Sequence, residues 1–184
     1  MTTHSASPPR FWTGSRPSPT GGSRARFDQS SHRVVEGLKW AALSSTEAWG
    51  KPRRLKGARA KGITYQHVVE RELKRRLPDG LFIGQWLQFV DSGGTGMAQP
   101  DAYLVGPHSV VVFEIKLTQR ESAIRQISEL YRPLLREIYK LPVVGVVVCK
   151  NLLWAPGGGK WLIGGPEDVL DNTREDIFTW HHLR

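Results

Sequence analysis

Hydrophobic positions recur at helical spacing in two stretches of the chain. In residues 63–77 they follow one another at four-residue steps, which places them on one face of a helix. The turn sequence Leu77-Pro78-Asp79-Gly80 predicts where this helix ends. In residues 118–140 apolar side chains are three or four residues apart, which predicts a longer amphipathic helix that Pro133 is expected to kink.

Shorter segments between and after these helices have the patterns of β-strands. Residues 81–90 predict a strand or one arm of a hairpin. Residues 101–105 and 110–117 predict two strands joined by the turn 106–109. Residues 143–148 consist of Val and Gly, the pattern of a central strand buried on both faces. The predicted order of elements is therefore α, β, β, β, α, β.

These patterns divide the chain into three parts. Residues 1–61 begin with a stretch rich in Ser, Pro, Gly and Arg, which predicts a flexible basic arm, and a short docking helix is expected within residues 34–49. Residues 62–152 form the predicted compact core, in which 91–96 is expected to be a flexible loop. Residues 153–184 are expected to be a C-terminal extension that packs on the core, with His181 and His182 in a solvated tail.

The charge of the chain favours an anionic partner. The net charge is +9 and the isoelectric point is near 10.1, and nucleic acid is the most common partner of such basic proteins. Six cations within eleven residues, with no acid among them, form either a solvated linker or a strap that contacts phosphate groups. These cations are Lys51, Arg53, Arg54, Lys56, Arg59 and Lys61.

Several classes of protein are excluded. A single cysteine, Cys149, permits neither an internal disulfide nor a zinc site built from cysteines. The longest strongly apolar run, residues 142–149, is far shorter than the roughly 20 residues of a membrane span. The N-terminus has no apolar segment typical of a secretory signal. We therefore expect a cytoplasmic protein with no membrane partner.

The strand at 110–117 carries the most informative pattern. Its odd-numbered positions are all apolar, whereas its even-numbered positions change from apolar to charged, ending in Glu114 and Lys116. If the four-residue turn pairs Val105 with Val110, Asp101 lies opposite Glu114. Two carboxylates so placed repel each other and need more compensation than Lys116 provides, and a divalent ion such as Mg²⁺ would supply it. The alternative is a structural hairpin with a salt-bridged rim, and a register slip of one residue would put Asp101 on the other face.

The segment Gln99-Pro100-Asp101, twelve intervening residues and then Glu114-Ile115-Lys116 resembles the motif of the PD-(D/E)xK nuclease superfamily, in particular its short phage-encoded members. The resemblance covers residues 62–152 and implies an α/β fold, with a restriction-endonuclease-like αβββαβ core whose mixed central sheet is flanked by helices. It implies a DNA nuclease that depends on Mg²⁺, or alternatively Mn²⁺, and leaves a 5′-phosphate and a 3′-hydroxyl. A phage-encoded member would act in the host cytoplasm or in the virion.

The resemblance also implies roles for individual residues. Asp101, Glu114 and the main-chain carbonyl of Ile115 would bind the metal, and Lys116 would position or deprotonate the attacking water. Many members add a glutamate from the first helix, and projection at about 100° per residue favours Glu70 over Glu72 because Glu70 falls on the inward face. The alternative is an ordinary surface pair between Glu70 and Lys74.

Gln126 is the remaining predicted site residue, and we expect it to contact nucleic acid. RecB-type exonucleases carry a Gln-x-x-x-Tyr motif on the corresponding helix, but here Gln126 and Tyr131 are one residue too far apart. Two other functions remain open. One is a catalytically inactive nuclease-like protein that binds DNA or assists virion assembly, and the other is an RNA-binding structural protein that depends on its basic arm. The sequence leaves the oligomeric state, the choice of DNA or RNA, and endo- or exonuclease action undecided.

Overall fold

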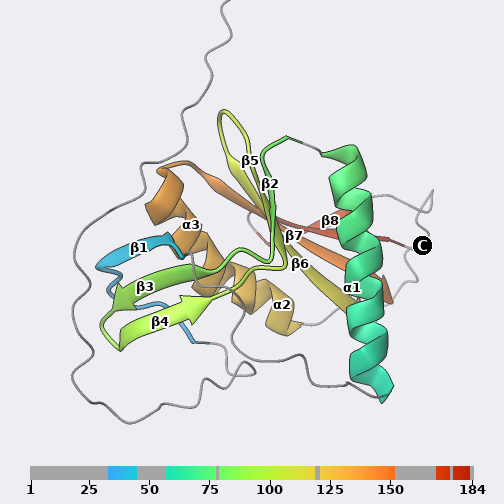
Figure 1. The fold of residues 1–184 in the computed structure, drawn as a ribbon, viewed down its shortest axis with the longest axis horizontal. Helices are drawn as coiled ribbons and strands as arrows, with labels where there is room; N and C mark the ends of the chain where they lie inside the picture. The colour runs from blue at the N-terminus through green and yellow to red at the C-terminus, as the bar shows by residue number, and fades with distance from the viewer. Residues whose placement is uncertain are drawn as a thin grey trace, which may run out of the picture. The chain divides into compact units, whose positions relative to one another are not determined.

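The computed structural model describes residues 33–44, 57–77, 79–118, 121–151, 169–174 and 176–182. All of them belong to one compact unit, His32–Arg184, which contains two β-sheets and two helical segments (Figure 1). Four of the predicted phosphate-contacting cations, Lys51, Arg53, Arg54 and Lys56, lie outside the described residues. No helix in the described ranges is long and apolar enough to span a membrane.

The larger sheet is mixed, as predicted, and has the strand order β2-β5-β6-β7-β9-β8. Strand β5 pairs antiparallel with both β2 and β6, the strands β6, β7 and β9 are parallel, and β8 pairs antiparallel with β9. The two long, valine-rich strands β6 and β7 lie in the middle of the sheet. The bounds of the strands are β2 Leu81–Ile83, β5 Ala102–Val105, β6 Val110–Thr118, β7 Val143–Asn151, β8 Val169–Arg174 and β9 Ile177–His181.

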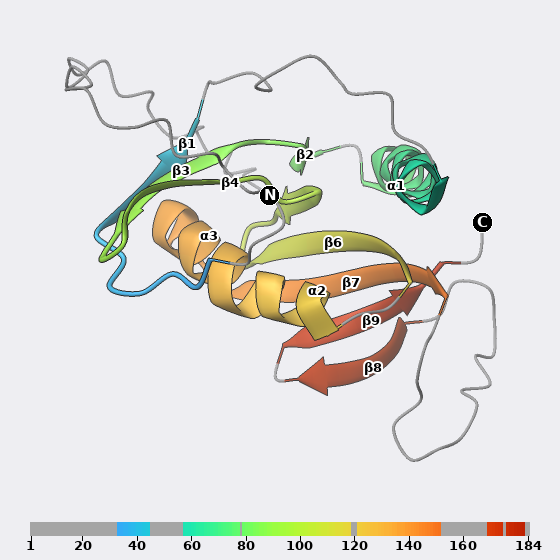
Figure 2. The ribbon, with the colours of Figure 1, turned by 90° about the horizontal axis from the view of Figure 1, so that it is seen from below.

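Helices cover both faces of this sheet (Figure 2). Helix α1 (Gly57–Arg76) packs through Val69 and Leu73 against one face, where Phe113 belongs to the same buried cluster. A continuous helical segment covers the other face and consists of α2 (Glu121–Arg125), η1 (Gln126–Tyr131) and α3 (Arg132–Tyr139). The strand expected at residues 81–90 is divided between the two sheets, as β2 and β3. With β3 and β4 set aside, the elements from α1 to β7 have the order α, β, β, β, α, β, and β9 and β8 extend the main sheet.

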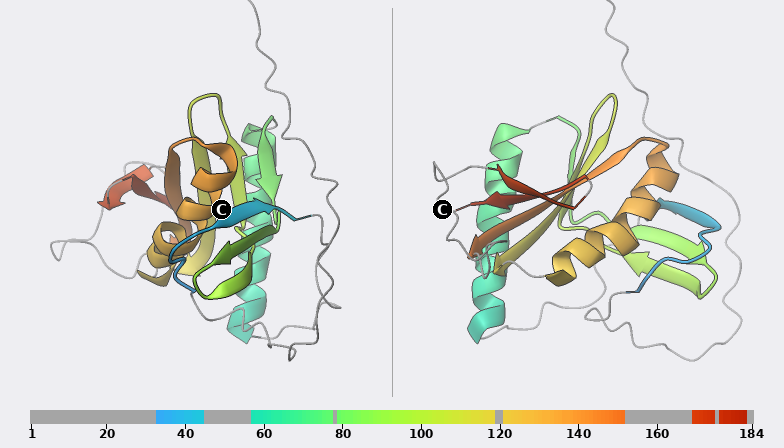
Figure 3. Two further views of the ribbon diagram at one scale, coloured as in Figure 1. Left: turned by 90° about the vertical axis from the view of Figure 1, so that its left-hand side faces the viewer. Right: turned by 180° about the vertical axis from the view of Figure 1, so that it is seen from behind.

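The second sheet was not predicted. It has the order β1-β3-β4, formed by Trp40–Leu43, Leu87–Asp91 and Gly94–Ala98, and its strand β1 contacts α3 (Figure 3). The helix expected within residues 34–49 is therefore wrong over Trp40–Leu43, and the loop expected at 91–96 is wrong from Gly94 onward. Gly96 lies opposite Phe89 in this sheet, and the Phe89 ring lies where a side chain at 96 would be, so the position requires glycine.

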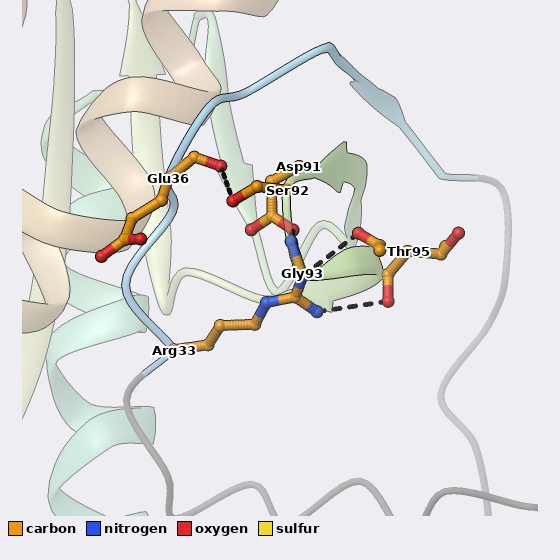
Figure 4. Close-up of polar contacts among 7 residues, drawn as sticks. Arg33, Glu36, Asp91, Ser92, Gly93 and Thr95 are labelled. Carbon is orange, nitrogen blue, oxygen red and sulfur yellow. Dashed lines mark hydrogen bonds and ion pairs between the residues drawn. The ribbon is translucent and has the colours of Figure 1, made fainter.

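A polar cluster fastens the segment before β1 to the turn between β3 and β4 (Figure 4). The Arg33 guanidinium pairs with the buried Asp91 carboxylate and donates hydrogen bonds to the carbonyl groups of Gly94 (3.1 Å) and Thr95 (3.3 Å). The backbone N–H and the hydroxyl of Ser92 both donate to the Glu36 carbonyl. The tight turn and the preceding chain are thus held together by contacts between residues more than fifty positions apart.

The segment η1 is a π-helix, and Pro133 explains why it forms. Proline has no N–H and its ring clashes with the carbonyl four residues earlier, so residue 133 cannot continue an α-helix through Glu129. The Glu129 carbonyl instead accepts a hydrogen bond from the N–H of Val35 (3.0 Å), and the N–H of Arg132 reaches back five residues to Ile127. In place of the expected kink at Pro133, the helix contains a short stretch with about one more residue per turn than an α-helix.

The end of the described chain is packed rather than solvated. His181 is the last residue of β9, which extends the sheet next to β7. His182 is completely buried, with its ring beside those of Tyr65 and Trp180. The prediction of a solvated tail is thus wrong for these two histidines, because the pairing of β9 with β7 draws them into the sheet.

Candidate active site

The hairpin of β5 and β6 has the predicted register. Val105 lies opposite Val110, Tyr103 opposite Val112 and Ala102 opposite Phe113. Asp101 directly precedes β5 at the end of the hairpin where Glu114 lies, and its charge raises the pKa of Glu114. The Asp101 side chain crosses to β6, where Oδ2 accepts a hydrogen bond of 2.7 Å from the N–H of Ile115. The two carboxyl groups therefore meet at one end of the hairpin.

Glu114 is the most buried acid of the site. Its side chain is 2% exposed, and Oε1 pairs with the Lys116 ammonium group. Oε2 is buried and has no hydrogen-bond partner within the described part of the chain. Burial raises the pKa of Glu114 to about 8, the charge on Asp101 adds to the rise, and Lys116 and the Tyr131 hydroxyl oppose it. Without further positive charge the carboxylate form is therefore strongly disfavoured.

The Asp101 carboxyl group has a similar environment. Burial raises its pKa, whereas the hydrogen bond from Ile115 and the charge of Lys116 lower it. A third acid, Glu70 of α1, is close enough for its charge to raise the pKa further. Two carboxyl groups that both resist ionisation, with an ammonium group beside them, have the electrostatics of a cation-binding site.

The two glutamates of α1 have different partners. Glu70 accepts a hydrogen bond from Gln66 (2.9 Å) and pairs with His67 (3.0 Å), and its side chain is only 15% exposed. Among the described residues it does not pair with Lys74, which was the alternative. Glu72 instead forms ion pairs with Arg75 and Arg76. The charge of Glu70 acts on the Asp101 carboxyl group, and its role in the site stays a prediction.

The π-helix brings Gln126 and Tyr131 together despite their spacing of five residues. Side chains five apart lie above one another in a π-helix, as those four apart do in an α-helix. The Gln126 amide donates to the Tyr131 hydroxyl, which in turn donates to the carbonyl of Gln99 (3.1 Å). Tyr131 is buried beside Glu114, whose charge raises the pKa of the phenol after the larger effect of burial.

Sequence reasoning missed this hydrogen-bond network, and Pro133 was the signal that could have indicated the π-helix. The spacing of Gln126 and Tyr131 departs by one residue from a Gln-x-x-x-Tyr arrangement. The structure shows that the extra residue is absorbed by the helix. The Gln126 side chain thus contacts Tyr131, and its contact with nucleic acid stays a prediction.

The donor set limits which metal ion could bind. Within the described ranges there is no group of three or more His, Cys, Asp or Glu side chains that could hold an ion. What the site offers is two carboxyl groups and a main-chain carbonyl. Mg²⁺ characteristically takes one or two protein carboxylates and keeps water and substrate oxygens as its other ligands. The buried Glu114 oxygen without a partner also fits an ion at this position.

Of the remaining predicted site residues, Arg59 and Lys61 lie on the first turns of α1, which begins at Gly57 rather than near residue 63. Both are exposed. Comparisons of the chain with protein-family models, with curated proteins and with solved structures give no match. The function of the chain is therefore argued from the chemistry of the Asp101–Glu114 site.

Proposed function

We propose that the chain is a nuclease that uses Mg²⁺, or alternatively Mn²⁺, to hydrolyse phosphodiester bonds of DNA. The observation that carries the proposal is the meeting of Asp101 and Glu114 across the hairpin. Glu114 is buried and Asp101 partly buried, both have raised pKa values, one oxygen of Glu114 has no hydrogen-bond partner among the described residues, and Lys116 pairs with Glu114. A purely structural hairpin gains nothing from two acids in this position, since like charges placed opposite each other are destabilising.

Each residue of the site would have a different role in hydrolysis. Asp101, Glu114 and the Ile115 carbonyl would hold the ion, which when bound supplies positive charge to the phosphate and acidifies water. Lys116 positions the attacking water and stabilises charge that develops on the phosphate. The water oxygen forms a bond to phosphorus while the bond from phosphorus to O3′ breaks. The products are a 5′-phosphate and a 3′-hydroxyl, which receives a proton.

Glu70 acts from the neighbouring helix. Its carboxylate is held by contacts with Gln66 and His67, and its charge acts on Asp101. A fixed acid at the edge of the Asp101–Glu114 pair can accept a hydrogen bond from water on that side. Glu72 is tied to two arginines and serves as a matched comparison on the same helix.

The test is an incubation of the purified protein with linear, circular and branched DNA, with and without Mg²⁺. Cleavage should require the ion, and Lys116→Ala or Glu114→Ala should abolish it while DNA binding persists. Lys140→Ala removes a lysine from a surface pair with Glu137 and should cleave as the unaltered protein does. DNA binding without cleavage in either Mg²⁺ or Mn²⁺ would favour the inactive nuclease-like protein instead.

A further inference from the structure

Helix α1 presents a basic face to solvent next to the Asp101–Glu114 pair. From residue 59 to its end, every exposed side chain of this helix except Thr64 is an arginine, a lysine or a histidine. Its two acids, Glu70 and Glu72, have side chains only 15% and 12% exposed and lie at the margins of this face. The exposed residues are Arg59, Lys61, Thr64, His67, Arg71, Lys74, Arg75 and Arg76.

Four of the cations on this face have no ion pair with an acid among the described residues. Arg75 and Arg76 pair with Glu72, whereas Arg59, Lys61, Arg71 and Lys74 form no ion pair among the described residues. Cations that stay unneutralised on one rigid helix repel one another, and an external polyanion relieves that repulsion. The arrangement therefore favours a partner with closely spaced negative charges.

The position of the basic face of α1 relative to Glu70 and Asp101 indicates that the polyanion is a nucleic acid. Arg71 and Lys74 follow Glu70 by one and four residues, and the charge of Glu70 reaches Asp101. From Arg59 to Arg75 the helix rises about 24 Å, at about 1.5 Å per residue. That length equals about seven phosphates of one B-form strand, at about 3.4 Å each.

We propose that this face of α1 holds the phosphate backbone of the nucleic-acid substrate beside the Asp101–Glu114 pair, with Arg71 and Lys74 as the principal contacts. The proposal rests on the proposed nuclease function and extends it. Sequence reasoning placed the phosphate contacts at residues 51–61. The proposal adds contacts at the turns of α1 that adjoin Glu70, and the contacts at residues 51–61 stay a prediction.

The test compares two double variants that remove the same charge from different faces. Arg71→Gln/Lys74→Gln alters the basic face, and Arg136→Gln/Lys140→Gln alters Arg136 of α3 and the residue that follows this helix, on the opposite face of the main sheet. Glutamine has a helix propensity close to those of lysine and arginine, so both variants should keep the fold, which circular dichroism checks. Binding to a labelled 20-base-pair duplex is followed by fluorescence anisotropy in EDTA over a range of NaCl concentrations.

For the variant of α1, the slope of log K against log salt should become less steep by about 1.8, since each lost phosphate contact removes about 0.9. The α3 variant should keep the slope of the unaltered protein. With Mg²⁺ present, the α1 variant should show a higher KM and a kcat within about twofold. Equal slope changes in the two variants, or no change in the α1 variant, would overturn the proposal.

These measurements separate the two proposals. If the unaltered protein binds DNA through α1 but never cleaves it, the nuclease activity fails and the binding surface stands. If it cleaves DNA while both variants bind and cleave alike, the α1 surface fails and the nuclease activity stands.

Discussion

Replacing Glu114 by glutamine should change how the stability of the metal-free protein depends on pH. Burial raises the pKa of this acid to about 8 in the folded protein, compared with 4.5 for an unperturbed glutamic acid. The folded state therefore binds a proton more tightly than the unfolded state. The contribution of this group to stability is complete below about pH 4.5 and is lost as the pH rises through about 8.

The size of the effect follows from the difference between the two pKa values. Each unit corresponds to about 1.36 kcal/mol, so the unaltered protein should lose up to about 5 kcal/mol of unfolding free energy across this pH range from Glu114 alone. Glutamine keeps the shape and neutrality of the protonated acid and cannot ionise. Glu114→Gln should therefore remain stable at pH 8.5, where the unaltered protein is weakened.

The assay is urea unfolding in EDTA at pH 5 and pH 8.5, followed by tryptophan fluorescence. Glu137→Gln is the control, because that carboxyl group is 43% exposed and pairs with Lys140 at the surface. Added Mg²⁺ should restore stability at pH 8.5 in the unaltered protein but not in Glu114→Gln. The reasoning is refuted if the stability gap between Glu114→Gln and the unaltered protein does not widen from pH 5 to pH 8.5.

Three further substitutions test the packing around the site. Tyr131→Phe removes the hydroxyl that links the π-helix to the connection between β4 and β5, and should lower the unfolding free energy by about 1–3 kcal/mol in urea titrations. Gly96→Ala should destabilise by about 1–3 kcal/mol or more because the new methyl group meets the Phe89 ring, which thermal unfolding would detect as a lower Tm. Arg33→Ala leaves the buried Asp91 without its cation and should cost about 1–3 kcal/mol, and a fully stable variant would contradict a stabilising role for the pair.

The hairpin that carries the site was predictable because its pattern is local. The change from apolar to charged positions along residues 110–117 and the four-residue turn were enough to predict the hairpin register, which is confirmed from Val105 opposite Val110 to Ala102 opposite Phe113. The choice of Glu70 over Glu72 followed from helical geometry in the same way. Both inferences use only residues within one element or two adjacent ones.

The features that were missed depend on partners far away in the sequence. Trp40–Leu43 becomes a strand because it pairs with β3 more than forty residues later, and no local pattern shows that. His182 is buried because β9 pairs with β7. Pro133 is a local cause of the π-helix, but the N–H that bonds the Glu129 carbonyl belongs to Val35, near the N-terminal end of the described residues.

The position of β1 has a practical consequence for anyone shortening the chain. In the small sheet β1 occupies one side of β3, whose other side is taken by β4. A truncation that begins at residue 45 would expose the N–H and C=O groups along Leu87–Asp91. Such open edges recruit strands from other molecules, so the shortened protein should self-associate. Trimming that stops before Arg33 would leave that edge covered.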